Sequence, residues 1–132
     1  MSDLPRRYVL EYPVRPWTTN AERRGNRYQR AALTKEWREA FYWLAKQRHV
    51  PRLDQVEIVA EPWQAKGILA DTAACNPAVK AAIDGLVDAG VIPDDTSAYV
   101  ASITFLPTRR GRDALTLTIN EVLDFSYLKA KP

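Results

Sequence analysis

The chain has 132 residues, of which 46% are apolar and 27% are charged, and its formal net charge is +3 at pH 7. This length matches one domain of common size, and the apolar share excludes a chain that is disordered throughout. The apolar runs are short, so we expect neither a membrane span nor a secretory signal. A single cysteine cannot form an internal disulfide, so we expect one domain over residues 1–132 in a reducing, cytoplasmic compartment.

The first half of the sequence predicts a strand, a polar connection and a long helix. Residues 7–14 (RYVLEYPV) are rich in aromatic and β-branched side chains and predict a strand that prolines end. Residues 15–30 are polar, and four arginines lie between positions 23 and 30. This composition indicates a connection outside the core. From Ala32 to Arg48, apolar residues recur at helical spacing. Trp43 lies beside the main apolar stripe and indicates either a wide core face or a second contact, such as a subunit contact.

A second helix and its ends can be read from the middle of the sequence. Residues 55–61 alternate in the manner of a strand. After them, Asn76 and Pro77 predict a helix start, with asparagine as the N-cap and proline at the first helical position. Gly90 follows the last turn and is expected to end the helix in the left-handed conformation.

The last part of the sequence predicts two strands, at residues 99–106 and 114–122, joined as a hairpin by a polar connection. Threonines alternate with leucines in the second strand, so one side of the hairpin faces solvent or a polar partner. The element order β-α-β-α-β-β predicts an α/β or α+β fold with a mixed four-stranded sheet and two helices.

Acidic residues flank the second predicted helix. Asp71 precedes it, Asp94 and Asp95 follow it, and Lys80 lies in its first turn. Converging carboxylates can hold Mg²⁺, which favours oxygen ligands, and such a site can support phosphodiester hydrolysis. Because a helix of about thirteen residues is about 20 Å long, Asp71 and Asp95 meet only if the chain folds back or a second subunit supplies one of them.

Each of these residues also fits an ordinary structural role. Asp71 fits a cap in the loop before the helix, and Asp94 with Asp95 fits a turn. Lys80 fits a surface ion pair with Asp84, which contributes little to stability. From the residues alone, both interpretations remain open.

Residues 71–95, DTAACNPAVKAAIDGLVDAGVIPDD, resemble the core of RusA-type Holliday junction resolvases. In that family, a D-x-D-N segment precedes a helix reading roughly K-A-x-x-D-x-L-x-x-A-G, and an Asp-Asp pair follows the helix. Residues 55–106 carry most of the resemblance, while the N-terminal EYPVRPWTTN and its following arginines agree more loosely. The family consists of small dimeric endonucleases that cut four-way DNA junctions with magnesium during DNA recombination and repair.

The resemblance implies a set of site residues. Asp71 and Asp95 correspond to metal ligands, with Asp94 as a neighbour or substitute, and Lys80 corresponds to the active-site lysine. The implied catalytic residues are therefore Asp71, Asp95 and Lys80, and the implied cofactor is Mg²⁺, with Mn²⁺ as an alternative. The implied assembly is a homodimer, which suits the two-fold symmetry of a four-way junction.

Basic residues outside this stretch indicate how branched DNA would be bound. Thirteen of the nineteen basic residues are arginine, which favours bidentate contacts to phosphates. The expected DNA-binding residues are Asn20, Arg23, Arg24, Arg27, Arg30 and Lys66. Tyr28 could stack on an unpaired base, and Arg109, Arg110 and Arg112 form a second basic tip. The alternative is that both clusters are solvated loops.

The sequence departs from the family pattern at one position of the acidic motif. Ala73 stands two residues after Asp71, where the second acid is expected, and Ala74 replaces the asparagine. The consequence is a weakened enzyme, an enzyme with a rearranged acid set that includes Asp84 or Asp88, or an inactive protein that binds branched DNA or a partner protein. A further alternative is a protein-interaction module that binds through Trp43 and the threonine-rich strand.

Overall fold

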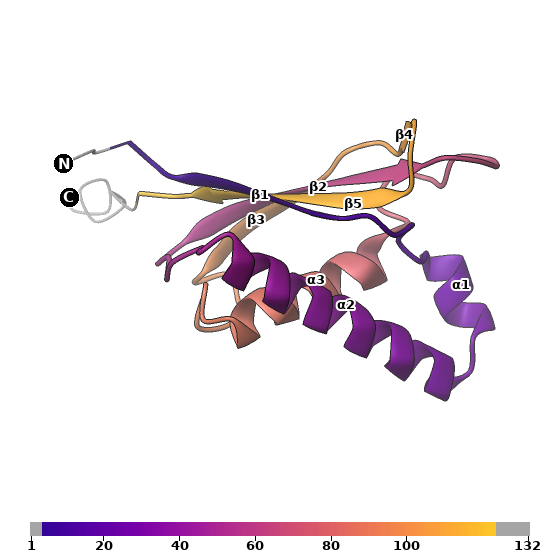
Figure 1. Ribbon diagram of the computed structural model, residues 1–132, viewed down its shortest axis with the longest axis horizontal. Coiled ribbons are helices and arrows are strands. Elements are labelled where there is room, and N and C mark those ends of the chain that lie inside the picture. The colour runs from indigo at the N-terminus through magenta and orange to yellow at the C-terminus, as the bar shows by residue number, and fades with distance from the viewer. Residues whose placement is uncertain (1–3, 124–132) are drawn as a thin grey trace, which may run out of the picture.

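The computed structural model describes residues 4–123, which form a mixed sheet with helices α2 and α3 covering one of its faces (Figure 1). The described elements, in chain order, are β1 (Arg7–Tyr12), α1 (Thr19–Arg24), α2 (Arg27–Gln47), β2 (Val56–Gln64), α3 (Asn76–Asp88), β3 (Val100–Phe105), β4 (Arg109–Arg110) and β5 (Ala114–Glu121). The predicted α+β class is confirmed. The described part of the chain adds helix α1 and the two-residue strand β4, which the sequence did not predict.

The strand order is β1-β5-β2-β3, with β4 beside β2. Strand β5 is antiparallel to both β1 and β2, whereas β3 and β4 run parallel to β2 on its other side. The predicted hairpin between the last two long strands is therefore wrong, because β2 lies between β3 and β5. The physical reason is that α3 connects β2 and β3, and a crossover helix places two strands parallel.

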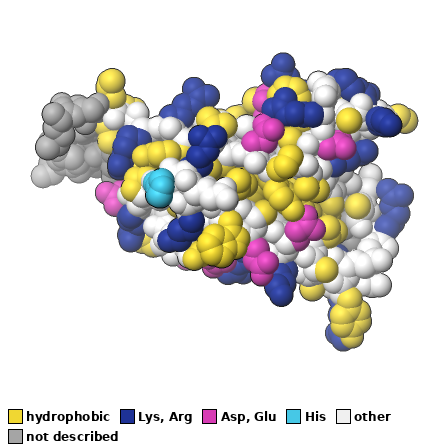
Figure 2. Space-filling view, in the orientation of Figure 1, with side chains coloured by type: hydrophobic (Ala, Val, Ile, Leu, Met, Phe, Trp, Pro, Cys, Tyr) yellow, Lys and Arg dark blue, Asp and Glu magenta, His cyan; other side chains and the backbone are white. Residues whose placement is uncertain are grey.

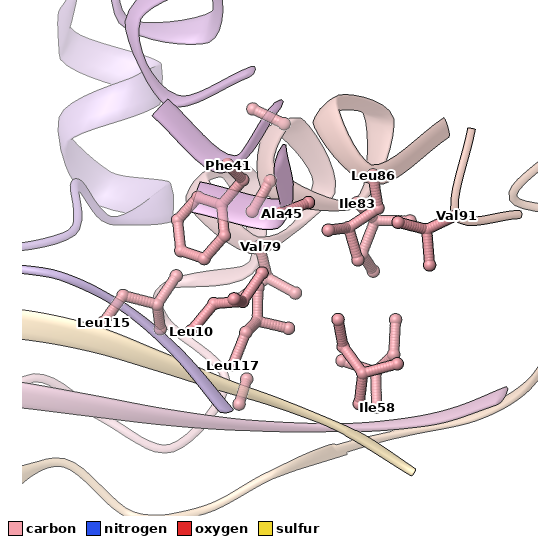
Figure 3. Close-up of a cluster of buried hydrophobic side chains, with 14 of the residues drawn as sticks. Leu10, Phe41, Ala45, Ile58, Val79, Ile83, Leu86, Val91, Leu115 and Leu117 are labelled. Atoms are coloured by element: carbon pink, nitrogen blue, oxygen red, sulfur yellow. The ribbon is translucent and has the colours of Figure 1, made fainter. Parts of the chain in front are cut away.

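The core fills the space between the sheet and the two long helices (Figure 3). Leu10 and Leu117 extend from the sheet toward Phe41 of α2 and Val79 of α3, and these four side chains are at most 1% exposed. Ile58 extends from β2 toward Leu86 of α3 and is fully buried. The expected alternation of β5 is confirmed, since its leucines are buried while its threonines lie on the opposite, partly exposed face. One face of the sheet is thus left without a covering layer of helices (Figure 1).

The N-terminal helices begin where polar side chains cap them. The Thr18 hydroxyl accepts a hydrogen bond from the Ala21 amide at 3.3 Å, which starts α1 within the segment predicted as a connection. The Asn26 side chain accepts from the Gln29 amide, and the Gln29 side chain accepts from the Asn26 amide. This reciprocal capping box starts α2 at Arg27, five residues before the predicted start at Ala32.

Helix α3 differs from its prediction at one end only. Asn76 is its first residue and Cys75 occupies the N-cap position, so the prediction that Asn76 is the N-cap is wrong. The Asn76 amide donates to the Ala73 carbonyl at 3.1 Å, and this preceding turn already places Asn76 within the helix. Gly90 has φ of +81°, which confirms its predicted role at the C-terminal end.

Candidate functional site

Helix α3 and the segment after it place Lys80 beside Asp95. The chain reverses at Gly90, where the Val91 amide donates to the Leu86 carbonyl at 3.0 Å. Val91 is fully buried and holds the returning segment against the core. The chain therefore folds back after the helix, and Lys80 Nζ forms an ion pair with the Asp95 carboxylate. The expected pair of Lys80 with Asp84 is not the one that forms.

The two acids of this returning segment are held by short hydrogen bonds. The Asp94 carboxylate accepts from the Asp95 amide at 2.8 Å. The hydrogen bond from Lys80 lowers the pKa of Asp95, and the same hydrogen bond raises the pKa of Lys80. Both groups are therefore charged at neutral pH. Because the Lys80 side chain is 63% exposed, solvent screens the pair, and exposed pairs stabilise a fold by only about 0–1 kcal/mol.

Asp71 lies in an exposed loop ahead of α3. Its carbonyl accepts a hydrogen bond from the Ala74 amide at 3.0 Å, so its main chain forms a turn. Its carboxylate has no hydrogen-bond or ion-pair partner among the described side chains. Within the described residues, no group of three or more acidic, histidine or cysteine side chains is close enough together to hold a metal ion. The fold thus gathers Lys80, Asp94 and Asp95 and leaves Asp71 outside any such cluster.

Ala73 adopts a backbone conformation that is uncommon for alanine. Its φ of +68° lies in the left-handed region, which costs an ordinary L-residue about 1–2 kcal/mol. Aspartate and asparagine enter this region several-fold more often than other residues with a side chain. The backbone at Ala73 is therefore compatible with the acid that the family motif would place there.

Helix α1 places the first basic residues beside the loop that precedes α3. The Thr19 amide and hydroxyl both donate to the Ala74 carbonyl, at 2.9 and 3.3 Å. Asn20, Arg23 and Arg24 are exposed on this short helix, and the Arg24 side chain donates to the Asn20 carbonyl at 3.3 Å. The arginines of α1 are thus held near the loop that carries Asp71 by a contact to the main chain of Ala74.

The first turn of α2 continues this basic surface. The Arg27 guanidinium lies 5.0 Å from the centroid of the Tyr28 ring and donates to its hydroxyl at 3.2 Å. Tyr28 is 71% exposed, so its ring is accessible to a partner. Arg30 donates to the Gly25 carbonyl at 2.5 Å and joins the start of α2 to the end of α1.

A buried amide shapes the loop that carries Lys66, and sequence reasoning missed it. Gln64 is 2% exposed, and its Nε2 donates to the carbonyls of Lys66 and Ile68, both at 2.7 Å. Its Oε1 accepts from the Ala70 amide at 3.2 Å. The available signal was the alternation of the strand, which continues past Glu61 and points Gln64 inward.

The second basic tip is only partly available to a partner. Arg109 and Arg112 lie 4.6 and 3.8 Å from the ring centroid of Trp63. Each also pairs with a carboxylate of a neighbouring strand, at 3.3 and 2.6 Å respectively. These two arginines therefore stabilise the sheet, and Arg110 is the member of the tip without a carboxylate partner among the described residues.

These basic residues gather at one end of the molecule, which we call the basic end. It comprises α1, the first turn of α2, residues 65–70 and β4. Figure 2 shows lysine and arginine side chains along the upper and right-hand border, where β4 and α1 lie in Figure 1. Helix α3 begins at this end, since its preceding loop contacts α1. The basic end and the first turn of α3, which carries Lys80, therefore lie at the same end of the molecule.

The sequence matches no model of a known protein family, and a search of curated proteins finds no match either. None of the helices in residues 4–123 combines the length and the apolar composition that crossing a membrane requires.

Proposed function

We propose that this chain is a RusA-like, structure-selective endonuclease that resolves four-way DNA junctions by metal-dependent phosphodiester hydrolysis. The observation that carries the proposal is the return of Asp94 and Asp95 to Lys80, on a helix that begins at the basic end. Hydrolysis of a phosphodiester needs carboxylates and a positive charge next to a surface that binds phosphates. The proposal combines this geometry with the family resemblance of residues 71–95.

In the proposal, Mg²⁺, or Mn²⁺ in its place, is held only partly by protein. Mg²⁺ is typically bound through one or two carboxylates, with waters and substrate phosphates completing its shell. In the proposal, Asp71 and Asp95 are the ligands and Asp94 is a neighbour or substitute. When bound, such an ion polarises a phosphoryl oxygen and activates a water. Lys80 contributes a fixed positive charge near the phosphate, where negative charge develops.

The basic end would hold the DNA. The proposed phosphate contacts are Asn20, Arg23, Arg24, Arg27, Arg30 and Lys66, all of them on α1, the first turn of α2 or residues 65–70. Tyr28 offers a largely exposed ring on which an unpaired base could stack. Because phosphate contacts release counterions, the affinity should fall steeply between about 50 and 200 mM salt.

The proposal includes a homodimer, because paired cuts in a two-fold symmetric junction need two active sites. Light scattering of the protein with and without a synthetic junction measures the stoichiometry. Two protein chains per junction are expected. One chain per junction at saturation contradicts this part of the proposal.

Cleavage of a synthetic four-way junction in Mg²⁺ tests the activity directly. Asp71→Asn and Asp95→Asn should each reduce the cleavage rate by about 100-fold, because each removes one proposed carboxylate ligand of the ion that polarises the phosphate. Glu39→Gln is the matched control, since it removes one exposed carboxylate from α2, beside Tyr12 and Trp43 and not among the proposed site residues. Equal cleavage rates in the wild type and both aspartate variants would contradict the assignment of Asp71 and Asp95 to the site.

A second function, a junction-binding protein without nuclease activity, is favoured by two observations. The described residues contain no cluster of three metal-binding side chains, and Ala73 stands where the family has an acid. This function predicts salt-sensitive binding without cleavage in Mg²⁺ or Mn²⁺. Because the backbone at Ala73 accepts aspartate, Ala73→Asp should then create cleavage. If the wild type already cuts, this second function is excluded.

A further inference from the structure

The loop of residues 65–70 carries an exposed apolar side chain on a fixed backbone. Ile68 is 94% exposed, and its neighbour Leu69 is 38% exposed. The buried Gln64 amide donates to two carbonyls of the loop and accepts from the Ala70 amide, so the conformation of the loop is fixed from inside. Ile68 therefore contributes nothing to the core, and its side chain is available to a partner.

Three cations surround this apolar tip. Arg110 donates to the Gly67 carbonyl at 2.7 Å, and Arg15 donates to the Lys66 carbonyl at 3.5 Å. Neither these two arginines nor Lys66 has a carboxylate partner among the described residues. Their charges are therefore available to an anionic partner, and the loop's own carbonyls hold the two guanidinium groups near its tip.

We infer that residues 65–70 form a wedge that recognises the branch point of DNA, with Ile68 inserted between bases while Lys66, Arg15 and Arg110 bind the flanking phosphates. Proteins that kink DNA insert apolar side chains such as isoleucine between base steps, and the cost is the unstacking of that step. Base pairs at a branch point are already less well stacked, so insertion there costs less than in a continuous duplex. The inference rests on the proposed function and adds the residue that distinguishes a junction from a duplex.

The alternative occupant with the same charge is an anionic lipid surface. Stable binding to a membrane surface takes a broad apolar face or more than one anchor. This loop offers only Ile68 and the less exposed Leu69, and its backbone is fixed in a narrow tip. A narrow apolar tip between cations suits a gap between two bases better than a lipid headgroup layer.

The test uses a synthetic four-way junction with the fluorescent base 2-aminopurine at the branch point, and a duplex of the same sequence. Wild-type protein should increase the fluorescence of the junction, because insertion unstacks the reporter base. Ile68→Ser should abolish this increase and weaken junction binding about tenfold, which corresponds to about 1.4 kcal/mol, with duplex binding unchanged. Ile68→Phe should retain both the fluorescence increase and the affinity for the junction, since a larger apolar side chain can fill the same gap.

Ile103→Ser is the matched control, because Ile103 is a partly exposed isoleucine (41%) on β3 and outside the loop. It should bind junctions like the wild type. If Ile68→Ser keeps the fluorescence increase and the preference for junctions, the wedge is wrong while the proposed function stands. If Ile68→Ser instead loses only binding to vesicles that contain phosphatidylserine, the loop is a lipid contact. If the wild type binds neither DNA, both the wedge and the proposed function fail.

Discussion

At Gly85, helix α3 lies close to the main chain of α2. A Cβ atom added there would lie 3.0 Å from the Tyr42 amide nitrogen and 3.2 Å from the Arg38 carbonyl carbon, and nearer still to the Arg38 carbonyl oxygen. Ordinary contacts of a Cβ begin at 3.4 Å, so the two helices must separate to accept an alanine. Overpacking of this kind costs about 1–3 kcal/mol, whereas alanine gains about 1 kcal/mol over glycine in helix propensity. We expect the contact to dominate, because both obstructing groups are main chain.

Urea unfolding measures this balance. Gly85→Ala should lower the free energy of unfolding by about 2 kcal/mol, which is the upper end of the overpacking cost (about 3 kcal/mol) less the propensity gain (about 1 kcal/mol), because the obstructing groups are main chain. Asp84→Ala is the control on the same helix, since it raises helix propensity at a neighbouring position that is only partly buried. An unchanged or increased free energy in Gly85→Ala would refute the close approach of the two helices.

Three other variants test parts of the structure that support the site. His49 follows the C-cap of α2 and has φ of +53°, in the left-handed region that glycine adopts without strain. His49→Gly should therefore raise the free energy of unfolding by about 1 kcal/mol, and a decrease would contradict the left-handed conformation at this position. Gln64→Leu removes the donor that holds residues 65–70, so we expect faster proteolysis in this loop and a free energy of unfolding lower by about 1–3 kcal/mol. An unchanged rate of proteolysis would show that the amide does not fix the loop. The hydrogen bond from Arg38 lowers the pKa of Asp88. The pKa of Asp88 is therefore lower in the folded chain than in the unfolded chain, where it is about 3.9. The pair stabilises the fold above a pH of about 3.9, and this stabilisation is lost as the pH falls through the pKa of Asp88 in the folded chain. The difference in urea midpoint between wild type and Asp88→Asn should therefore shrink from about pH 6 to pH 2, and a constant difference would exclude the pair.

Local patterns predicted the long elements, and non-local contacts decided the rest of the fold. The leucine and threonine alternation of β5 indicated its two faces, and Gly90 indicated the end of α3, because both signals act within a few residues. The position of β5 between β1 and β2 depends on pairing with β1 across more than 100 residues and with β2 across 51 to 65 residues, which no local pattern records. Helix α1 was missed because five of its six residues are polar, so it carries no apolar stripe.

The candidate site was predictable to a similar extent. The order of residues along the chain indicated Lys80, Asp94 and Asp95 as candidates. Lys80 and Asp95 come together only because the chain folds back after Gly90, and the sequence did not show whether it does so. The alternation of β2 indicated that Gln64 points inward, but its hydrogen bonds were not predictable, because they depend on where the carbonyls of residues 65–70 lie in the folded chain. The assignment of function to these residues remains a prediction that the cleavage assay tests.

The strand order also determines when the domain can fold during its synthesis. Among the described strands, β1 pairs only with β5, and β5 fills the position between β1 and β2. Until residues 114–121 leave the ribosome, β1 has no partner and one side of β2 exposes unpaired amides and carbonyls. Such open edges are templates for aggregation. A premature stop codon before residue 114 would therefore yield an aggregating chain and not a smaller working domain.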